Sequence, residues 1–180
     1  MTELNTVVIF YSRYGNTESL ALSAGVGAIQ ARANVRFRKV PEIVDSQTAE
    51  SDPQWKQNLD RMNQEYIAPR EIDLEWADVL VLAIPSEAPD EMNRYLYALK
   101  NLTGKIAAPF SSRCITHGEK DPPLLALYAA AARVGLMVVP APAETAGDPI
   151  QGVRAHVRRV AEIARALKPH LATSNSAAAP

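Results

Sequence analysis

The chain has 180 residues, of which 47% are hydrophobic, so it can bury one core of ordinary size and is small for two domains. We therefore predict a single domain over residues 1–172. Lys and Arg (19) nearly balance Asp and Glu (20), which argues against a nucleic acid or an anionic membrane as partner. A single cysteine excludes an internal disulfide framework and a cysteine-rich metal centre.

The first residues show no sign of a leader segment. Residues 1–6 contain no basic cluster, and the apolar run from Val7 to Phe10 is too short for a signal peptide or a membrane span. We expect a cytoplasmic protein without membrane contact.

The first part of the chain reads as a strand, a helix and a second strand. Asn5 to Tyr11 is a continuous apolar run, typical of a strand whose sheet is covered on both faces. Thr17 to Arg32 has a helical period, and the small residues on its apolar face predict a helix that lies close on a sheet. Val35 to Val40 alternates with basic residues and predicts the second strand.

Residues 42–72 are polar and weakly patterned, although Trp55, Leu59 and Met62 recur at roughly helical spacing. We interpret this segment as a long loop. Such a loop could cover a site, contact a neighbouring subunit, or do neither.

The second half of the chain continues the alternation of strands and helices. Val79 to Ile84 is the strongest buried-strand signal. The low-complexity tail, residues 173–180, is expected to be disordered. Between them we predict a helix marked by Met92, Tyr95, Leu96 and Leu99, a strand over Ile106–Ser111, a helix over Leu124–Val134, a strand over Leu136–Val139 and a last helix from about Val153 to Leu171.

Apolar strands that alternate with helices predict an α/β fold, a doubly wound parallel sheet with helices on both faces. In such sheets ligands bind beyond the carboxyl ends of the strands, where the strand order reverses. Function is therefore expected in the first loop (residues 12–17), the second loop (85–91) and the third loop (112–121).

The first loop reads Ser12-Arg13-Tyr14-Gly15-Asn16-Thr17. It offers hydroxyls and an amide at a helix N-terminus, where unpaired N–H groups and the helix dipole favour an anion. The sequence therefore indicates a phosphate cradle, with Gly15 allowing a sharp turn. The pattern is neither a Walker loop nor a dinucleotide fingerprint. The alternative is that Asn16 and Thr17 only cap the helix.

Four segments in order carry a resemblance to a known family: Val8–Asn16, Ala77–Ser86, Gly104–Ser112 and Gly135–Pro140. Through them the chain resembles the flavodoxin-like NAD(P)H:quinone oxidoreductases, in particular the group named for tryptophan-repressor-binding protein. The resemblance implies a five-stranded flavodoxin-like sheet of order 2-1-3-4-5 and FMN with its phosphate on the first loop. It also implies reduction of a quinone-type acceptor by NAD(P)H, and a homodimer or homotetramer.

The resemblance further implies a set of cofactor contacts. The first loop matches the family's phosphate loop, and the start of the second loop matches the family's flavin-contacting loop. The third loop supplies the remaining candidates, and no metal site is expected. The expected cofactor-binding residues are Ser12, Arg13, Tyr14, Gly15, Asn16, Thr17, Pro85, Ser86, Ser111, Ser112, Arg113, His117 and Gly118.

The loops that would contact the flavin ring depart from the family pattern. The second loop continues as Glu87-Ala88-Pro89-Asp90-Glu91, without the family's arginine, aromatic and glycine-asparagine pair. The third loop has one glycine, Gly118, where the family has several. Two hypotheses follow. Either FMN binds with new ring contacts from Tyr14, Tyr95 or residues 113–120, or the flavin is lost and the fold serves as a non-catalytic binding or assembly module.

No side chain needs to be a nucleophile in this chemistry, because the cofactor supplies the reactivity. His117 is the one histidine in a candidate loop and could donate to a flavin carbonyl or a quinone oxygen, although a solvated position is the simpler interpretation. Cys114 does not fit as the nucleophile of a small tyrosine phosphatase, because Lys120 stands where that class of enzyme needs an arginine. A near-neutral charge argues against a one-electron carrier.

Overall fold

The computed structural model describes residues 3–42, 50–85, 91–99, 102–112, 121–141 and 148–176, and for Glu91 and residues 172–176 it describes the backbone alone. Five parallel strands form one sheet of order β2-β1-β3-β4-β5, which confirms the predicted fold class and strand order. The strands are β1 (Asn5–Phe10), β2 (Asn34–Lys39), β3 (Val79–Ile84), β4 (Ile106–Ser111) and β5 (Met137–Val138).

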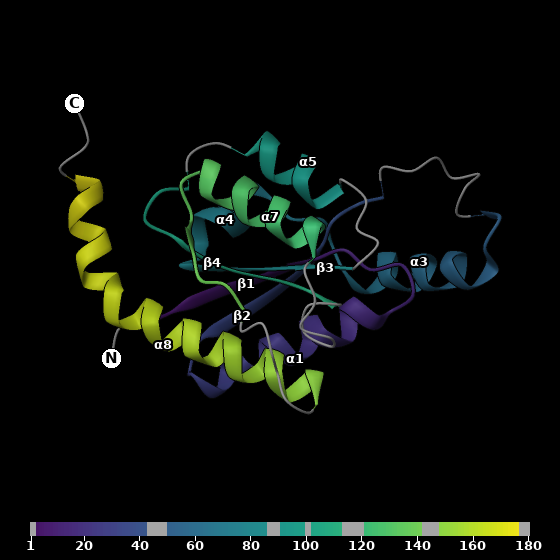
Figure 1. Cartoon of the computed structure of the whole chain (residues 1–180), viewed down its shortest axis with the longest axis horizontal. Coiled ribbons are helices and arrows are strands. Elements are labelled where there is room, and N and C mark those ends of the chain that lie inside the picture. The colour runs from purple at the N-terminus through teal and green to yellow at the C-terminus, as the bar shows by residue number, and fades with distance from the viewer. Residues whose placement is uncertain are drawn as a thin grey trace.

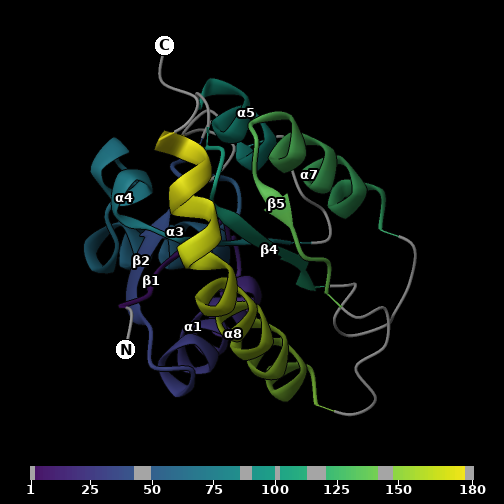
Figure 2. The same cartoon turned by 90° about the vertical axis from the view of Figure 1, so that its left-hand side faces the viewer.

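Helices cover both faces of this sheet, as two views at right angles show (Figure 1, Figure 2). One face is packed by α1, α3 and α8, and the other by α4, α5 and α7. The helices are α1 (Asn16–Gln30), α3 (Pro53–Glu65), α4 (Glu71–Trp76), α5 (Glu91–Ala98), α7 (Pro122–Arg133) and α8 (Pro149–Ser176).

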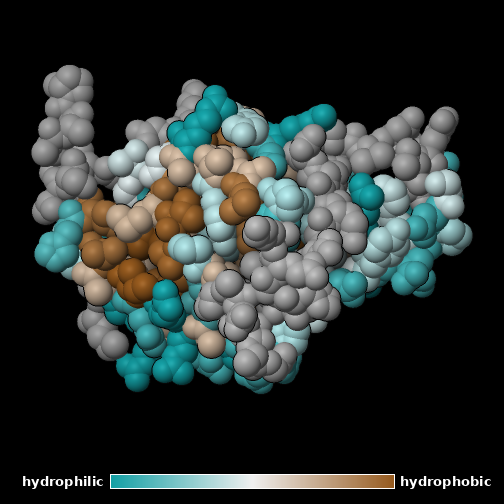
Figure 3. Space-filling model, in the orientation of Figure 1, coloured by the Kyte–Doolittle hydropathy of each residue, from teal (hydrophilic) through white to brown (hydrophobic). Residues whose placement is uncertain are grey.

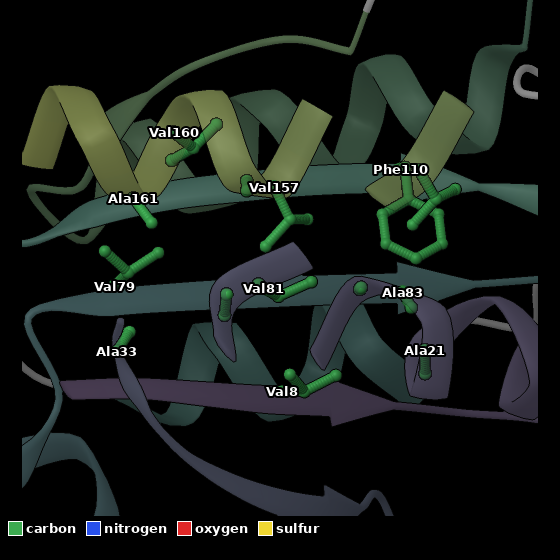
Figure 4. Packing of buried hydrophobic residues seen from close by; sticks show 14 of the residues in the cluster. Val8, Ala21, Ala33, Val79, Val81, Ala83, Phe110, Val157, Val160 and Ala161 are labelled. Atoms are coloured by element: carbon green, nitrogen blue, oxygen red, sulfur yellow. The ribbon is translucent and has the colours of Figure 1, made fainter. Parts of the chain in front are cut away.

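The core is divided by the sheet into two apolar layers. Successive strand residues point to opposite faces, so Val8 packs in the layer under α1 and α8 while Val7 packs in the other. Figure 4 shows Val157 and Ala161 of α8 packed against the strand residues of the first layer. Because both faces are covered, every residue of β3 is buried, which explains its uninterrupted apolar sequence.

Small residues bring α1 and α8 into close contact. A Cβ atom added at Gly27 would lie 2.3 Å from the carbonyl oxygen of Arg154 in α8. The small-residue face of α1, predicted to lie on a sheet, therefore also seats a second helix. This contact holds α1 in place, and α1 is the helix into which the first loop leads.

Residues 42–72 were predicted to be a long loop, but their described part contains α3 and the start of α4. The carboxylate of Asp52 accepts hydrogen bonds from the first backbone N–H groups of α3, with both N···O distances at 3.1 Å. Of α3 only Trp55 and Met62 are buried, and Figure 3 shows hydrophilic side chains over the outer surface of this helix. The loop prediction is wrong because the polar residues that dominate α3 obscure its narrow apolar stripe.

The last helix, α8, ends at Ser176, so it includes the first part of the tail that was expected to be disordered. Residues 177–180 lie outside the described residues. In the part of the chain that the structure describes, no helix combines the length and apolar character needed to cross a membrane.

Candidate functional site

A cavity of about 200 Å³ opens at the carboxyl edge of the sheet. β1 lies between β2 and β3, so the strand order reverses here and the segments that follow β1 and β3 lie side by side. The cavity joins residues from all three predicted loops and is lined by Ser12, Arg13, Tyr14, Asn16, Thr17, Pro85 and Ser112. All of these lining residues are among the cofactor contacts expected from the sequence.

The turn of the first loop is made by Gly15. This residue is the N-cap of α1, with φ 89° and ψ −13°, a left-handed conformation that favours glycine. Its backbone N–H donates to Oγ of Ser12 at 3.1 Å. Because Gly15 has no side chain, α1 receives no side-chain cap, and Asn16 and Thr17 are helical residues. The capping alternative therefore does not describe this loop.

The donor set of the first loop suits a phosphate group. Ser12 and Thr17 are buried residues with hydroxyl groups, and Arg13 adds a positive charge on the cavity wall. The glycine turn opens directly into the uncapped first turn of α1, whose N–H groups and dipole favour an anion. The residues present thus fit the phosphate half of a mononucleotide.

Helix α3 packs beside the first loop, and Figure 1 shows both at the same end of the sheet. The hydroxyl of Tyr14 donates to Oδ2 of Asp52 at 2.7 Å. The guanidinium of Arg13 stacks over the ring of Trp55, with 4.4 Å between the Arg13 Cζ atom and the ring centroid. Helix α3 and its N-cap thus contact the first loop, and the three roles left open for residues 42–72 stay hypotheses.

A buried carboxylate lies beneath the loop. Glu18, in the first turn of α1, accepts hydrogen bonds from both terminal nitrogens of Arg61 at 2.9 and 2.5 Å and from the Tyr66 hydroxyl at 2.9 Å. Burial raises the pKa of Glu18, but the bonds from Arg61 and Tyr66 together outweigh burial and hold it below its usual value. Burial and the Glu18 carboxylate raise the pKa of Tyr66 to about 12.

Arg13 also joins a polar chain that leads away from the cavity. Its Nε donates to the Tyr11 hydroxyl at 3.0 Å, and that hydroxyl donates to Glu42 at 2.6 Å. Lys39 lies 3.7 Å from the Glu42 carboxylate. Burial lowers the pKa of Lys39, while Glu42 opposes this shift. The orientation of Arg13 is thus fixed by Tyr11, just after β1, and by Trp55 on α3.

Ser111, at the end of β4, is fully buried and its hydroxyl donates to Asp121. Asp121 is the N-cap of α7 and accepts from the Leu124 backbone N–H at 3.3 Å. This pair secures the start of α7. The expected contact of Ser111 with a cofactor stays a prediction.

The structure separates the two tyrosines considered for the flavin ring. Tyr14 lines the cavity. Tyr95, on α5, packs against the core layer under α4, α5 and α7, and burial raises its pKa. The contacts expected from Ser86, Arg113, His117 and Gly118 lie outside the described residues and stay predictions.

Sequence reasoning missed the residues of α3 and its C-terminal neighbour that support the loop, namely Asp52, Trp55, Arg61 and Tyr66. One signal was present: Asp52 followed by Pro53 is a common helix start. The pairing of Arg61 with Glu18 had no local signal, because 43 positions separate the two residues in the sequence.

Curated relatives share one name. The chain is 28% identical over 145 residues to NAD(P)H dehydrogenase (quinone) 3 of Rhizobium meliloti, a match that covers 76% of this chain and 66% of that protein. It is 27% identical over 145 residues to NAD(P)H dehydrogenase (quinone) of Archaeoglobus fulgidus, covering 76% of this chain and 75% of the relative. No protein-family model matches the chain.

Solved structures agree on the fold. A flavodoxin from the domain Archaea superposes with a TM-score of 0.59 at 16% identity, over 90% of this chain and 99% of that one. A putative quinone reductase from Klebsiella pneumoniae superposes with a TM-score of 0.52 at 14% identity, over 89% of this chain and 85% of the other. The chain thus has the flavodoxin-like fold and is a distant relative of the proteins named NAD(P)H dehydrogenase (quinone).

Proposed function

We propose that this protein is an FMN-dependent oxidoreductase that passes electrons from NAD(P)H to a quinone-type acceptor. The observation that carries the proposal is the cavity at the strand-order reversal, where a loop suited to phosphate meets residues of the second and third loops. The name shared by the curated relatives supports the reaction class.

The chain's own residues would bind and orient the cofactor. The Ser12 and Thr17 hydroxyls and the first-turn N–H groups of α1 would hold the phosphate, and Arg13 would offset its charge. Pro85 and Ser112 form other parts of the cavity wall, next to the loops expected to meet the ring. FMN would supply the hydride chemistry, so the protein contributes position, field and exclusion of water.

Three finer assignments belong to the same proposal. We propose that the chain belongs to the group named for tryptophan-repressor-binding protein, which its first loop and ordered segments resemble. We propose FMN as the flavin because the loop suits a terminal phosphate. We further propose a homodimer or homotetramer, as the resemblance implies, and a cytoplasmic location.

Activity measurements test the proposal. Protein reconstituted with FMN should oxidise NADH or NADPH when a benzoquinone is supplied. Thr17→Val keeps the shape of a buried residue and removes its hydroxyl, so FMN should bind about tenfold more weakly and activity at limiting FMN should fall accordingly. Ser19→Ala, an exposed position on the same helix, is the matched control and should leave both unchanged.

A protein that binds FMN yet transfers no electrons from either nicotinamide to the quinone would contradict the enzymatic part of the proposal. It would favour the non-catalytic binding module. Equal losses in Thr17→Val and Ser19→Ala would contradict the placement of the phosphate on the first loop.

A further inference from the structure

We propose that Arg61 is a positioning residue for the cofactor phosphate: it holds and neutralises the Glu18 carboxylate, which would otherwise oppose a dianion at the first turn of α1. This inference rests on the proposed function, since it concerns the phosphate of FMN. It assigns to α3 an electrostatic role that the sequence did not reveal.

The first step is the position of Glu18. This residue lies in the first turn of α1, and one of its carboxylate oxygens is 3.7 Å from where a Cβ atom of Gly15 would be. The carboxylate therefore lies against the backbone of the first loop. Glu18 is only 6% exposed, so water screens its charge poorly.

The second step is the competition for the helix N-terminus. The same N–H groups and dipole that favour a ligand phosphate also favour an acidic side chain in the first turn. A bare carboxylate at Glu18 would satisfy part of this positive field and repel the incoming dianion. The loop can favour phosphate only if another group balances that charge.

The third step is the partner that balances it. The Arg61 guanidinium makes two hydrogen bonds to the Glu18 carboxylate, at 2.9 and 2.5 Å, and the Tyr66 hydroxyl donates a third at 2.9 Å. These bonds draw the charge of Glu18 towards α3. They also keep Glu18 ionised, because its pKa is lowered despite burial.

A purely structural role for the pair makes a different prediction. α3 is also held to the loop by Tyr14 with Asp52 and by Arg13 with Trp55. If the ion pair only anchors α3, every change to it should weaken the site. If it balances charge, the sign of the effect should follow the charge that is removed.

The experiment measures FMN and riboflavin affinities by fluorescence quenching for the wild type and three variants. Riboflavin lacks the phosphate and so reports on the ring site alone. Glu18→Gln keeps the shape and leaves Arg61 charged, so FMN should bind about fivefold to tenfold more tightly. Arg61→Met leaves Glu18 uncompensated, so FMN should bind about tenfold more weakly.

The double variant Glu18→Gln, Arg61→Met should return FMN affinity to within about threefold of the wild type, because both charges are gone. Riboflavin affinity should change by less than about twofold throughout. Weaker FMN binding by Glu18→Gln, or parallel changes for FMN and riboflavin, would overturn the inference. If Arg61→Met fails to fold, Glu18→Gln alone decides by the direction of its effect.

The two proposals fail in different ways. A wild-type protein that binds no FMN would overturn the proposed function, and the inference with it. Wild-type binding together with a loss in Glu18→Gln would overturn the charge-balancing role alone.

Discussion

His156 illustrates how a single buried side chain links pH to folding in this molecule. It lies on α8, is 3% exposed, and neither ring nitrogen has a hydrogen-bond partner among the described residues. Burial, aided by the positive charge of Arg159, lowers its pKa to about 4 from an ordinary 6.5. The folded protein therefore holds this ring neutral, while the unfolded chain takes up a proton as the pH falls.

The free energy of unfolding should consequently fall as the pH drops from about 6.5 towards 4. Between pH 7 and 5 the loss from His156 should be about 2 kcal/mol, measured by urea denaturation at a series of pH values. His156→Leu should remove this slope. His170→Leu, an exposed position on the same helix, should retain it, and a slope unchanged in His156→Leu would contradict the assignment.

At the same scale, the sequence identified the cavity residues of the first loop but not their supports. Ser12 and Gly15 lie between an apolar strand and a helix, and Thr17 lies in the first turn of that helix, so their positions could be inferred from local pattern. The pairing of Glu18 with Arg61 depends on how α3 packs, which no short-range pattern records.

At the scale of the elements, the contact between α1 and α8 leaves no room for a side chain at Gly27. A Cβ at Gly27 would meet the Arg154 carbonyl oxygen at 2.3 Å, and a helix backbone cannot move aside cheaply. A Cβ at Gly25 would come equally close, but to the end of the Phe37 ring, which can turn.

We therefore predict that Gly27→Ala lowers the free energy of unfolding by about 2 kcal/mol, in spite of the better helix propensity of alanine. Gly25→Ala, two positions away, should cost less than about half as much. Chemical denaturation of both variants checks the prediction. Equal losses, or a larger loss in Gly25→Ala, would contradict the close helix contact.

The elements also show why sequence patterns succeed unevenly. β3 and β4 have the bounds predicted from the sequence, because strands buried on both faces are almost continuously apolar. For α3 the sequence pattern predicted a loop, because only two of its residues, Trp55 and Met62, are buried. A helix that supports a site but buries few of its residues is hard to recognise from its sequence pattern.

For the whole molecule, the strand order explains where the site lies. The chain moves from β1 outward to β2 and then returns to β3 on the other side, which leaves a crevice between the segments after β1 and β3. The alternation of strands and helices predicted the parallel sheet, and the family resemblance implied this strand order. It could not predict that α3, inserted between β2 and β3, would pack beside the crevice.

The most direct test of the central claim is an equilibrium titration of flavin-free protein with FMN, followed by flavin fluorescence and absorbance. The account predicts saturable binding of one FMN per chain. Excess inorganic phosphate should weaken this binding, because it competes for the first loop. A protein that takes up no FMN, or binds it with no effect of phosphate, would contradict the claim that this loop holds the cofactor's phosphate.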